Sequence, residues 1–305
     1  MNKKRVAVID LGTYNCRLSI ADISNNEFKT IYTLSKPLNL GKNLVYRGEF
    51  DKEVIQRTAL FFQKMAFIIK QYDTDEYRCI ATEACRKSIN AKDLINEIKL
   101  KSDLDVEIIT AEEEANLCLK SCSKKYLKNN KNSFVFDIGG GSTELILYNN
   151  KNSFDTFDFI SLPYGVLNLD EYKSVFSEKK VIELIDRELR FFEDKYFKDI
   201  DELYAIGCCV TATSLAIINK DLGSYKKSNI NKLEINYKAF KETSDKLLKM
   251  TREEKKDISN IGPNYKLLDN GNFILSRILN IFIFEKIIFS DNGLRSSILK
   301  NFLES

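Results

Sequence analysis

The chain has 305 residues, of which 44% are hydrophobic and 30% are charged, and its formal net charge is +3. This composition excludes a disordered chain and leaves room for two folded domains. A charge so close to neutrality argues against a general nucleic-acid coat, so we expect no DNA partner. Histidine is absent. Acid and base chemistry therefore falls to carboxylates, and a metal, if present, is expected to be a hard cation with oxygen ligands.

Two apolar segments bear on the cellular location. The N-terminal apolar run, residues 6–9, stops at Asp10 after four residues, which is too short for a signal peptide. Residues 273–289 are interrupted by Arg277, Glu285 and Lys286, and they predict a core helix followed by a strand rather than a membrane helix. We therefore expect a cytoplasmic protein without a membrane partner.

The seven cysteines include no Cys-x-x-Cys pair. Cys118 and Cys122 are one helical turn apart, and Cys208 and Cys209 are adjacent. An odd number of cysteines without a secretion signal predicts reduced and mostly buried thiols, and no zinc site is expected.

The first predicted strand, residues 5–9, ends in Asp10 and is followed by Leu11, Gly12 and Thr13. From residue 16 the chain alternates as a second strand, where a dinucleotide-binding unit would begin a helix. We therefore predict a hairpin. Arg17 on its second strand either reaches an anion held at the turn or is an ordinary surface arginine.

Helices and strands alternate in the next hundred residues. Residues 51–72 carry apolar side chains at helical spacing with Asp51 as the N-cap, and strands are predicted at 77–82 and 106–109. The segment that follows the first of these strands contains Arg86, which either addresses phosphate or is simply solvated at the start of a helix.

Three glutamates follow Thr110 at the start of another predicted helix. Thr110 and Glu113 have the spacing of a capping box, which gives Glu113 a structural role. Glu112 and Glu114 remain as carboxylates that the helix dipole stabilises as anions, ready to accept a proton. The alternative is that all three simply decorate a helix N-terminus.

Residues 134–144 repeat the strand, Asp, apolar residue and Gly order of the first hairpin, with three consecutive glycines. Such a turn lets backbone N–H groups converge on an anion, while an aspartate and a Ser or Thr hydroxyl organise a cation. Asp137 and Glu144 are the candidates for holding a metal or positioning water. A tight hairpin without a ligand is the alternative, but the copy at Asp10 favours a phosphate site.

Two such strand–turn–strand units predict two similar domains that face each other. The lysine- and asparagine-rich residues 124–132 place the boundary near residue 123, which gives domains of residues 1–123 and 124–293. We expect a terminal helix at about 294–305 to pack back on the first domain.

The order of these segments resembles that of the exopolyphosphatase and guanosine pentaphosphate phosphohydrolase (Ppx/GppA) family. The segments that carry the resemblance are 8–13 with Arg17 and Leu18, 81–86 with Asn90, 113–115, 137–144, 161–165 and 290–295. The resemblance implies an α/β fold with two ribonuclease-H-like domains of the actin, sugar kinase and Hsp70 (ASKHA) type, an interdomain cleft, and the short two-domain form of the family.

The resemblance also implies an activity, which is metal-dependent release of a terminal phosphate from polyphosphate or pppGpp. It assigns Glu114 and Glu144 as the catalytic carboxylates, with Mg²⁺, or Mn²⁺ as the alternative, as the cofactor. The predicted metal ligands are Asp10, Asp137 and Glu144. The predicted phosphate-binding residues are Gly12, Thr13, Arg17, Arg86, Gly139, Gly140, Gly141, Ser142 and Thr143.

Three segments depart from the family pattern. Cys209 and Val210 stand where two glycines are usual, Asn168 stands where an arginine is common, and Tyr265 lies near a usual Arg-Ala-Asp. These departures put nucleotide recognition and the grip on long chains in doubt more than the catalytic centre.

Two other functions remain open at this point. A non-catalytic sensor of guanosine penta- or tetraphosphate or of polyphosphate would have the same fold. A small-molecule kinase is less favoured, because the predicted strand and turn at residues 203–207 lack the glycine pair expected beside an adenosine, and because Glu replaces Asp as the base. The sequence leaves open which phosphate chain is preferred, and whether the protein forms a homodimer.

Overall fold

The structure is a computed structural model. It describes residues 4–24, 27–122, 132–149, 157–197, 200, 203–220, 230–231, 233–258 and 265–304. Two compact units are present, Met1–Leu117 with Leu294–Ser305, and Cys118–Gly293. The division falls inside helix α5 (Ala111–Ser121), a few residues before the boundary near residue 123 suggested by the sequence.

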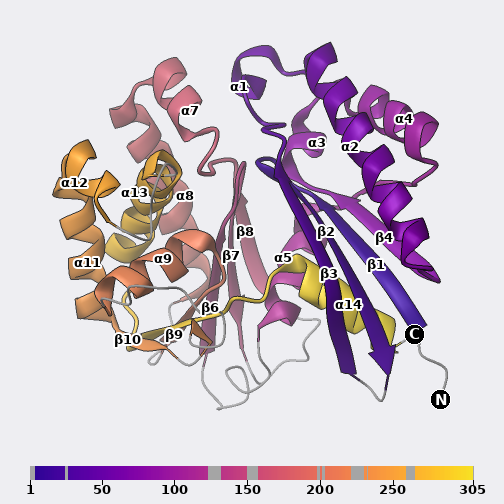
Figure 1. Ribbon diagram of the computed structural model, residues 1–305. Coiled ribbons are helices and arrows are strands. Elements are labelled where there is room, and N and C mark those ends of the chain that lie inside the picture. The colour runs from indigo at the N-terminus through magenta and orange to yellow at the C-terminus, as the bar shows by residue number, and fades with distance from the viewer. Residues whose placement is uncertain are drawn as a thin grey trace. The chain divides into compact units, whose positions relative to one another are not determined.

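The first unit is built on a five-stranded sheet with the order β3-β2-β1-β4-β5 (Figure 1). Its strands are β1 (Lys4–Leu11), β2 (Asn15–Ser24), β3 (Glu27–Pro37), β4 (Glu76–Ala81) and β5 (Glu107–Ile108). The first three form an antiparallel meander, and β4 and β5 run parallel to β1. The predicted first hairpin is therefore present.

Helices cover both faces of this sheet, which explains why β1 is a nearly continuous apolar run. These helices are α1 (Leu44–Arg47), α2 (Lys52–Gln71), α3 (Glu83–Lys87), α4 (Ala91–Ser102), α5 and α14 (Leu294–Glu304). Ile9 packs in the cluster that includes Phe62 of α2, whereas Val8 packs in the cluster that includes Ile298 of α14. The terminal helix thus belongs to the first unit, against β1.

The second unit repeats this plan on a six-stranded sheet with the order β10-β11-β9-β6-β7-β8. Its strands are β6 (Asn132–Ile138), β7 (Thr143–Tyr148), β8 (Asp158–Leu162), β9 (Leu203–Gly207), β10 (Glu234–Asn236) and β11 (Lys286–Phe289). Strands β8, β7 and β6 are antiparallel, and β9 and β11 continue in parallel, as in the first unit. Strand β10 is an added antiparallel edge.

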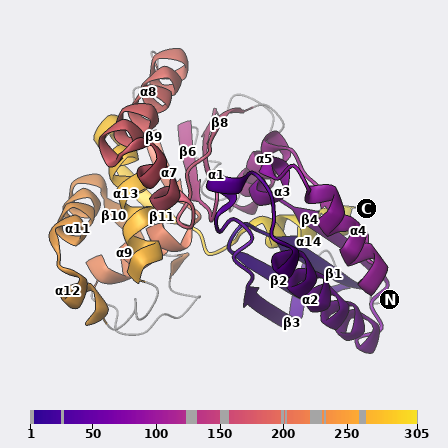
Figure 2. The same ribbon diagram turned by 90° about the horizontal axis from the view of Figure 1, so that it is seen from above.

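The second unit has six described helices. They are α7 (Leu169–Phe176), α8 (Glu178–Tyr196), α9 (Val210–Asn219), α11 (Tyr237–Lys249), α12 (Arg252–Lys256) and α13 (Tyr265–Ile281). Helices α9, α11 and α13 lie side by side (Figure 2). The apolar residues 273–289 form the end of α13 and strand β11, so the predicted core helix and strand are confirmed.

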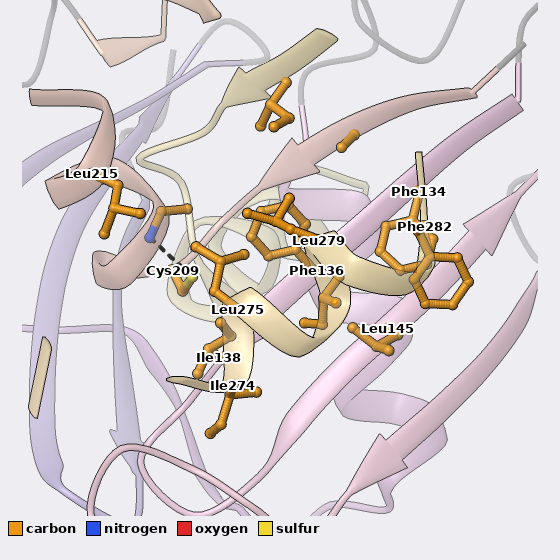
Figure 3. Close-up of a cluster of buried hydrophobic side chains, with 14 of the residues drawn as sticks. Phe134, Phe136, Ile138, Leu145, Cys209, Leu215, Ile274, Leu275, Leu279 and Phe282 are labelled. Carbon is orange, nitrogen blue, oxygen red and sulfur yellow. Dashed lines mark hydrogen bonds between the residues drawn. The ribbon is translucent and has the colours of Figure 1, made fainter. Parts of the chain in front are cut away.

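The core of the second unit lies between α13 and the middle of its sheet. Phe134 and Phe136 of β6 lie beside Leu275, Leu279 and Phe282 (Figure 3). The rings of Phe134 and Phe282 are 4.8 Å apart between centroids. This packing anchors β6 against α13 as far as Phe136, the residue before Asp137. Among the helices that the structure describes, none is long and apolar enough to cross a membrane.

Candidate active site

The two predicted turns have the same local geometry. Gly12 N donates to Asn15 O at 2.9 Å, and Gly139 N donates to Ser142 O at 2.9 Å. In each hairpin the aspartate lies two residues before the glycine, and one further residue pair separates it from the turn: Asp10 pairs with Arg17, and Asp137 pairs with Glu144. The internal repeat suggested by the sequence is therefore a repeat in structure as well.

Close backbone approach explains why these positions are glycines. A Cβ at Gly12 would lie 3.1 Å from Asn15 O, and one at Gly139 would lie 3.2 Å from Ser142 O. Gly165, in the loop after β8, is tighter still, because its Cβ would lie 2.5 Å from backbone atoms of the glycine turn. None of the three has a left-handed φ. Missing Cβ atoms, rather than special backbone angles, are what these turns require.

The carbonyl groups of the glycine turn are fixed by the loop after β8. Each carbonyl of residues 139–141 accepts a hydrogen bond of 2.9 Å; the donors are Val166 N, Leu167 N and Asn168 Nδ2. The N–H groups of Gly140, Gly141 and Ser142 donate to no acceptor in the described part of the chain, and the Ser142 hydroxyl is likewise without a partner there. Anchored carbonyls with free adjacent amides make a preformed anion site.

The first turn is anchored in the same way. Thr13 O accepts from Gly41 N at 3.0 Å, and Tyr14 O accepts from Leu38 N and Asn39 N at 2.9 Å each. No hydrogen bond from the amides of Thr13 and Tyr14 is found among the residues described. Both units thus offer unpaired backbone donors at the same point of the fold.

The two hairpins differ in the residue that faces the aspartate. Arg17 lies opposite Asp10, so both side chains point to one face of the first sheet. Burial raises the pKa of Asp10, and the nearby Arg17 and Arg295 lower it, with a net rise. The Arg17 guanidinium makes no hydrogen bond or ion pair within the described ranges, which leaves it able to take an anionic ligand.

In the second unit, Glu144 occupies the position that corresponds to Arg17 and lies opposite Asp137. Glu144 is 2% exposed, and its Oε1 accepts from Ser161 Oγ at 3.0 Å. Asp137 Oδ2 lies 3.9 Å from Cys118 Sγ. Two carboxylates facing each other across a ladder repel, and a cation between them relieves this repulsion. Their oxygens are the donors that a hard cation prefers.

Thr143 was also predicted to bind phosphate. Its hydroxyl donates to Tyr164 O at 2.8 Å and is buried. This hydroxyl proton therefore holds the loop after β8 against the turn. Phosphate binding by Thr143 stays a prediction, and it would require an atom of Thr143 other than this hydroxyl proton.

The three glutamates at the start of α5 differ in burial. Glu113 N donates to Thr110 Oγ1 at 3.1 Å, which is the predicted cap bond, and the Glu113 carboxylate accepts from Arg78 at 2.5 Å. Glu112 is exposed, whereas Glu114 is 8% exposed. Burial therefore distinguishes the two carboxylates that the helix-start pattern left as equal candidates, and the buried one is the Glu114 that the family resemblance implied.

Arg86 holds Glu114 in place. Its Nη2 lies 2.7 Å from Glu114 Oε2 and donates to Glu83 Oε2 at 2.9 Å, and its Nη1 donates to Ile109 O at 3.1 Å. Burial would lower the pKa of the Arg86 guanidinium, but Glu114 and Glu83 raise it above its ordinary value. Most donors of the predicted phosphate ligand Arg86 are thus engaged by protein acceptors.

Sequence reasoning missed the residues that support the glycine turn. Asn168 is buried, its Nδ2 donates to Gly141 O at 2.9 Å and to Pro163 O at 3.2 Å, and its Oδ1 accepts from Gly165 N at 2.7 Å. The sequence marked Asn168 only as a departure from the family. Its proximity to the glycines depends on a contact 27 residues apart in the chain, which no local pattern reveals.

A model of the Ppx/GppA phosphatase family matches residues 19–305. The chain belongs to this family. Among solved structures, it is similar to a Ppx/GppA family member from Aquifex aeolicus, with a TM-score of 0.80 and 26% identity over 99% of this chain and 98% of that one. An exopolyphosphatase from Cytophaga hutchinsonii has a TM-score of 0.83 at 22% identity, over 99% of this chain and 98% of that one.

Two protein relatives are informative. A bifunctional 3-dehydroquinate synthase/phosphatase from Fusobacterium nucleatum is 30% identical over 94% of this chain, but the match spans only 45% of that protein. Exopolyphosphatase 2 from Mycobacterium tuberculosis is 23% identical over 85% of this chain and 84% of its own length. With the two repeated sheets, these matches confirm the predicted family and the α/β fold of two ribonuclease-H-like domains of the ASKHA type.

Proposed function

We propose that this Ppx/GppA family member is a phosphohydrolase that releases terminal orthophosphate from inorganic polyphosphate, from the 5′-γ position of pppGpp, or from both. The observation that carries the proposal is the anchored turn whose amides have no acceptor among the described residues, and which is found in both units. Relatives support this substrate class by name: one is an exopolyphosphatase, and another, 27% identical over 54% of this chain, is a guanosine-5′-triphosphate,3′-diphosphate pyrophosphatase.

Phosphate binding is assigned to the two turns. The amides of residues 13–14 and 140–142 donate to phosphate oxygens, and Arg17 adds a charged donor that no described residue occupies. Because these donors are fixed before the substrate arrives, they stabilise charge that develops on the phosphoryl oxygens without reorganising.

A divalent cation, Mg²⁺ or Mn²⁺, is assigned to Asp137 and Glu144. Within the described ranges, no group of three or more Cys, Asp or Glu side chains is arranged to hold a metal. Two carboxylate ligands from the protein are nevertheless enough to bind Mg²⁺, because this ion usually takes its other ligands from water and substrate phosphates. When bound, the cation would neutralise phosphate charge. The role of Asp10 as a metal ligand stays a prediction.

Glu114 is assigned to the attacking water. Water adds to the terminal phosphorus in line with the bond that breaks, its proton passes to a Glu114 oxygen, and the shorter phosphate chain leaves with the bonding electron pair. No covalent intermediate is needed. In a chain without histidine, a buried carboxylate held in one position by an arginine is well suited to this role.

The decisive experiment measures orthophosphate release from polyphosphates of several lengths, pppGpp and ATP, with Mg²⁺ and Mn²⁺ in separate reactions. We expect release from at least one linear phosphate chain or from pppGpp. Calorimetric titration with the same compounds runs in parallel. Tight binding without release would overturn the assignment as an enzyme and select the sensor function, and consumption of ATP only with an acceptor would select a kinase.

A further inference from the structure

Three cysteine sulfurs of the second unit form a chain of contacts that ends at Asp137. Cys122 Sγ and Cys208 Sγ are 3.4 Å apart, and Cys208 also shares a hydrogen bond with Cys118. Cys118 Sγ in turn lies 3.9 Å from Asp137 Oδ2. The proposed hydrolysis uses none of these thiols. They are also not arranged as a metal site in the described part of the chain.

We propose that Cys122 and Cys208 form a reversible disulfide, which makes this cluster an oxidation site coupled to the carboxylate pair of the second turn. The formation of the bond does not depend on the proposed function. Its effect on catalysis does rest on that function, because the effect is exerted through Asp137.

The chemistry requires a disulfide oxidant of low molecular weight. The Cys208 sulfur attacks one sulfur of the oxidant, and the oxidant's other half leaves as a thiol that carries the Cys208 proton. The Cys122 sulfur then displaces the second half from the mixed disulfide, again with transfer of its proton. The two protein thiols lose two electrons in total, and the oxidant is reduced to two thiols.

The positions of the two sulfurs favour this pair. A disulfide requires that they approach by about 1.4 Å, from 3.4 Å to roughly 2.05 Å. Cys208 is half-buried and Cys122 is fully buried, so Cys208 is the more accessible residue of the pair, and Cys122 completes the bond internally. Cys208 lies between β9 and α9, and Cys122 directly follows α5, where the backbone adjusts more easily than inside an element.

Oxidation would change the surroundings of Asp137 in two ways. Pairing with Cys122 removes the Cys208 thiol as a hydrogen-bond partner of Cys118, the residue in contact with Asp137. It also pulls on the backbone beside β6, because Cys208 N donates to Phe136 O at 3.1 Å, one residue before Asp137. We therefore expect weaker cation binding in the oxidised protein.

The reaction should be slow. The hydrogen bond with Cys118 raises the pKa of Cys208, the hydrogen bond with Cys122 opposes this rise, and burial adds to it. The net pKa is well above the ordinary value, so little thiolate exists near neutral pH. Sustained oxidation over hours, rather than a brief pulse, is the condition to test.

The test uses the full chain incubated with oxidised glutathione and analysed by peptide mass spectrometry. We expect one internal Cys122–Cys208 link that dithiothreitol reverses, that is lost in Cys208→Ser, and that is retained in Cys85→Ser, the matched control at a buried cysteine of the first unit. Absence of a link, or a link from Cys208 to Cys118, would overturn the proposal.

The effect of the disulfide on the carboxylate pair is measured in a separate experiment. Calorimetric Mg²⁺ binding and phosphate release should both fall severalfold in the oxidised parent, recover with dithiothreitol, and stay constant in Cys208→Ser. If no sample releases phosphate, but the disulfide forms and weakens Mg²⁺ binding, the proposed function is rejected and the coupling of the disulfide to the carboxylate pair is retained. A formed link that leaves both readouts unchanged would reject the coupling.

Discussion

At the scale of single residues, the arrangement around Glu114 is the most informative feature. Arg86 binds Glu83 and Glu114 together and is itself only 16% exposed in its side chain. A guanidinium has a rigid set of donors, so it fixes the orientation of both carboxylates as well as balancing their charge. The family resemblance suggested Arg86 as a phosphate ligand, and the observed contacts suggest that it positions Glu114.

Replacing Glu114 by Gln tests the catalytic assignment. The amide is close to the carboxylate in size but cannot accept the proton of water, so phosphate release should fall by about 10²-fold or more. The matched control is Glu112→Gln, two residues away in the same helix and exposed, which should retain the activity of the parent. Equal activity of the Glu114 variant and the parent, measured by phosphate release, would contradict the assignment.

Replacing Arg86 by Lys separates a positioning role from phosphate binding. If Arg86 positions Glu114, kcat should fall between about tenfold and a hundredfold while KM changes little, because the charge remains but the orientation of Glu114 is lost. A phosphate ligand would instead show a raised KM with kcat preserved. Arg78→Lys, which alters the comparable pair with Glu113, serves as the control for a general change in the helix start.

At the scale of elements, the repeated hairpin is specialised by one cross-strand position. Arg17 faces the aspartate in the first unit, and Glu144 faces it in the second. The backbone hydrogen bond of the turn is the same in both, and the proposed function assigns an anion alone to the first turn and an anion together with a cation to the second because of this difference in side-chain charge.

Two variants test this division of labour by calorimetry. Arg17→Gln should weaken orthophosphate binding by about tenfold through loss of a charge-assisted hydrogen bond, and should leave Mg²⁺ binding unchanged. Glu144→Gln should weaken Mg²⁺ binding by more than about tenfold, because one of two carboxylate ligands is lost. Interchanged effects of the two variants would refute the proposed specialisation.

The fit of Gly165 against the glycine turn yields a prediction about stability. Gly165→Ala places a Cβ 2.5 Å from backbone atoms that cannot move independently, and it should reduce the free energy of unfolding by about 2 kcal/mol or more. Phosphate affinity should fall as well, because the loop that anchors the turn is displaced. Gly293→Ala, where nothing lies within 4 Å, is the control and should leave the melting temperature close to that of the parent.

At the scale of the whole molecule, the two units share one strand order, β3-β2-β1-β4-β5 and β8-β7-β6-β9-β11. In each, a central strand carries an aspartate one residue before its end. Asp10 in the first unit and Glu144, opposite Asp137 in the second, are buried, so each unit keeps an ionisable group where burial opposes its charge. Sites of this kind reduce the stability of the fold in return for function.

The loss of stability caused by ionising the buried Asp10 carboxyl can be measured as a dependence of the free energy of unfolding on pH. Burial raises its pKa above the ordinary 3.8, so between that value and the raised pKa the folded state binds more protons than the unfolded state. The free energy of unfolding should therefore decrease as pH rises through this window, and Asp10→Asn should remove this contribution. Denaturant titrations of both proteins across the window give the difference, and parallel curves would contradict the prediction.

The sequence by itself determined the family, the class of fold and the two hairpins. These features depend on local patterns: the apolar runs of β1 and β6, the Asp, apolar residue and Gly order that ends them, and the helical spacing of residues 51–72. Such patterns act over a few residues, through backbone sterics and the burial of one face, and so they can be read along the chain.

Only the tertiary structure decided which side chains work together. It distinguished buried Glu114 from exposed Glu112, brought Arg86 against Glu114, seated Gly165 on the glycine turn and placed Cys208 beside Cys122. These contacts join residues from about 25 to 86 positions apart in the chain. Their geometry follows from how the helices and loops pack on each sheet, and no local sequence pattern specifies it.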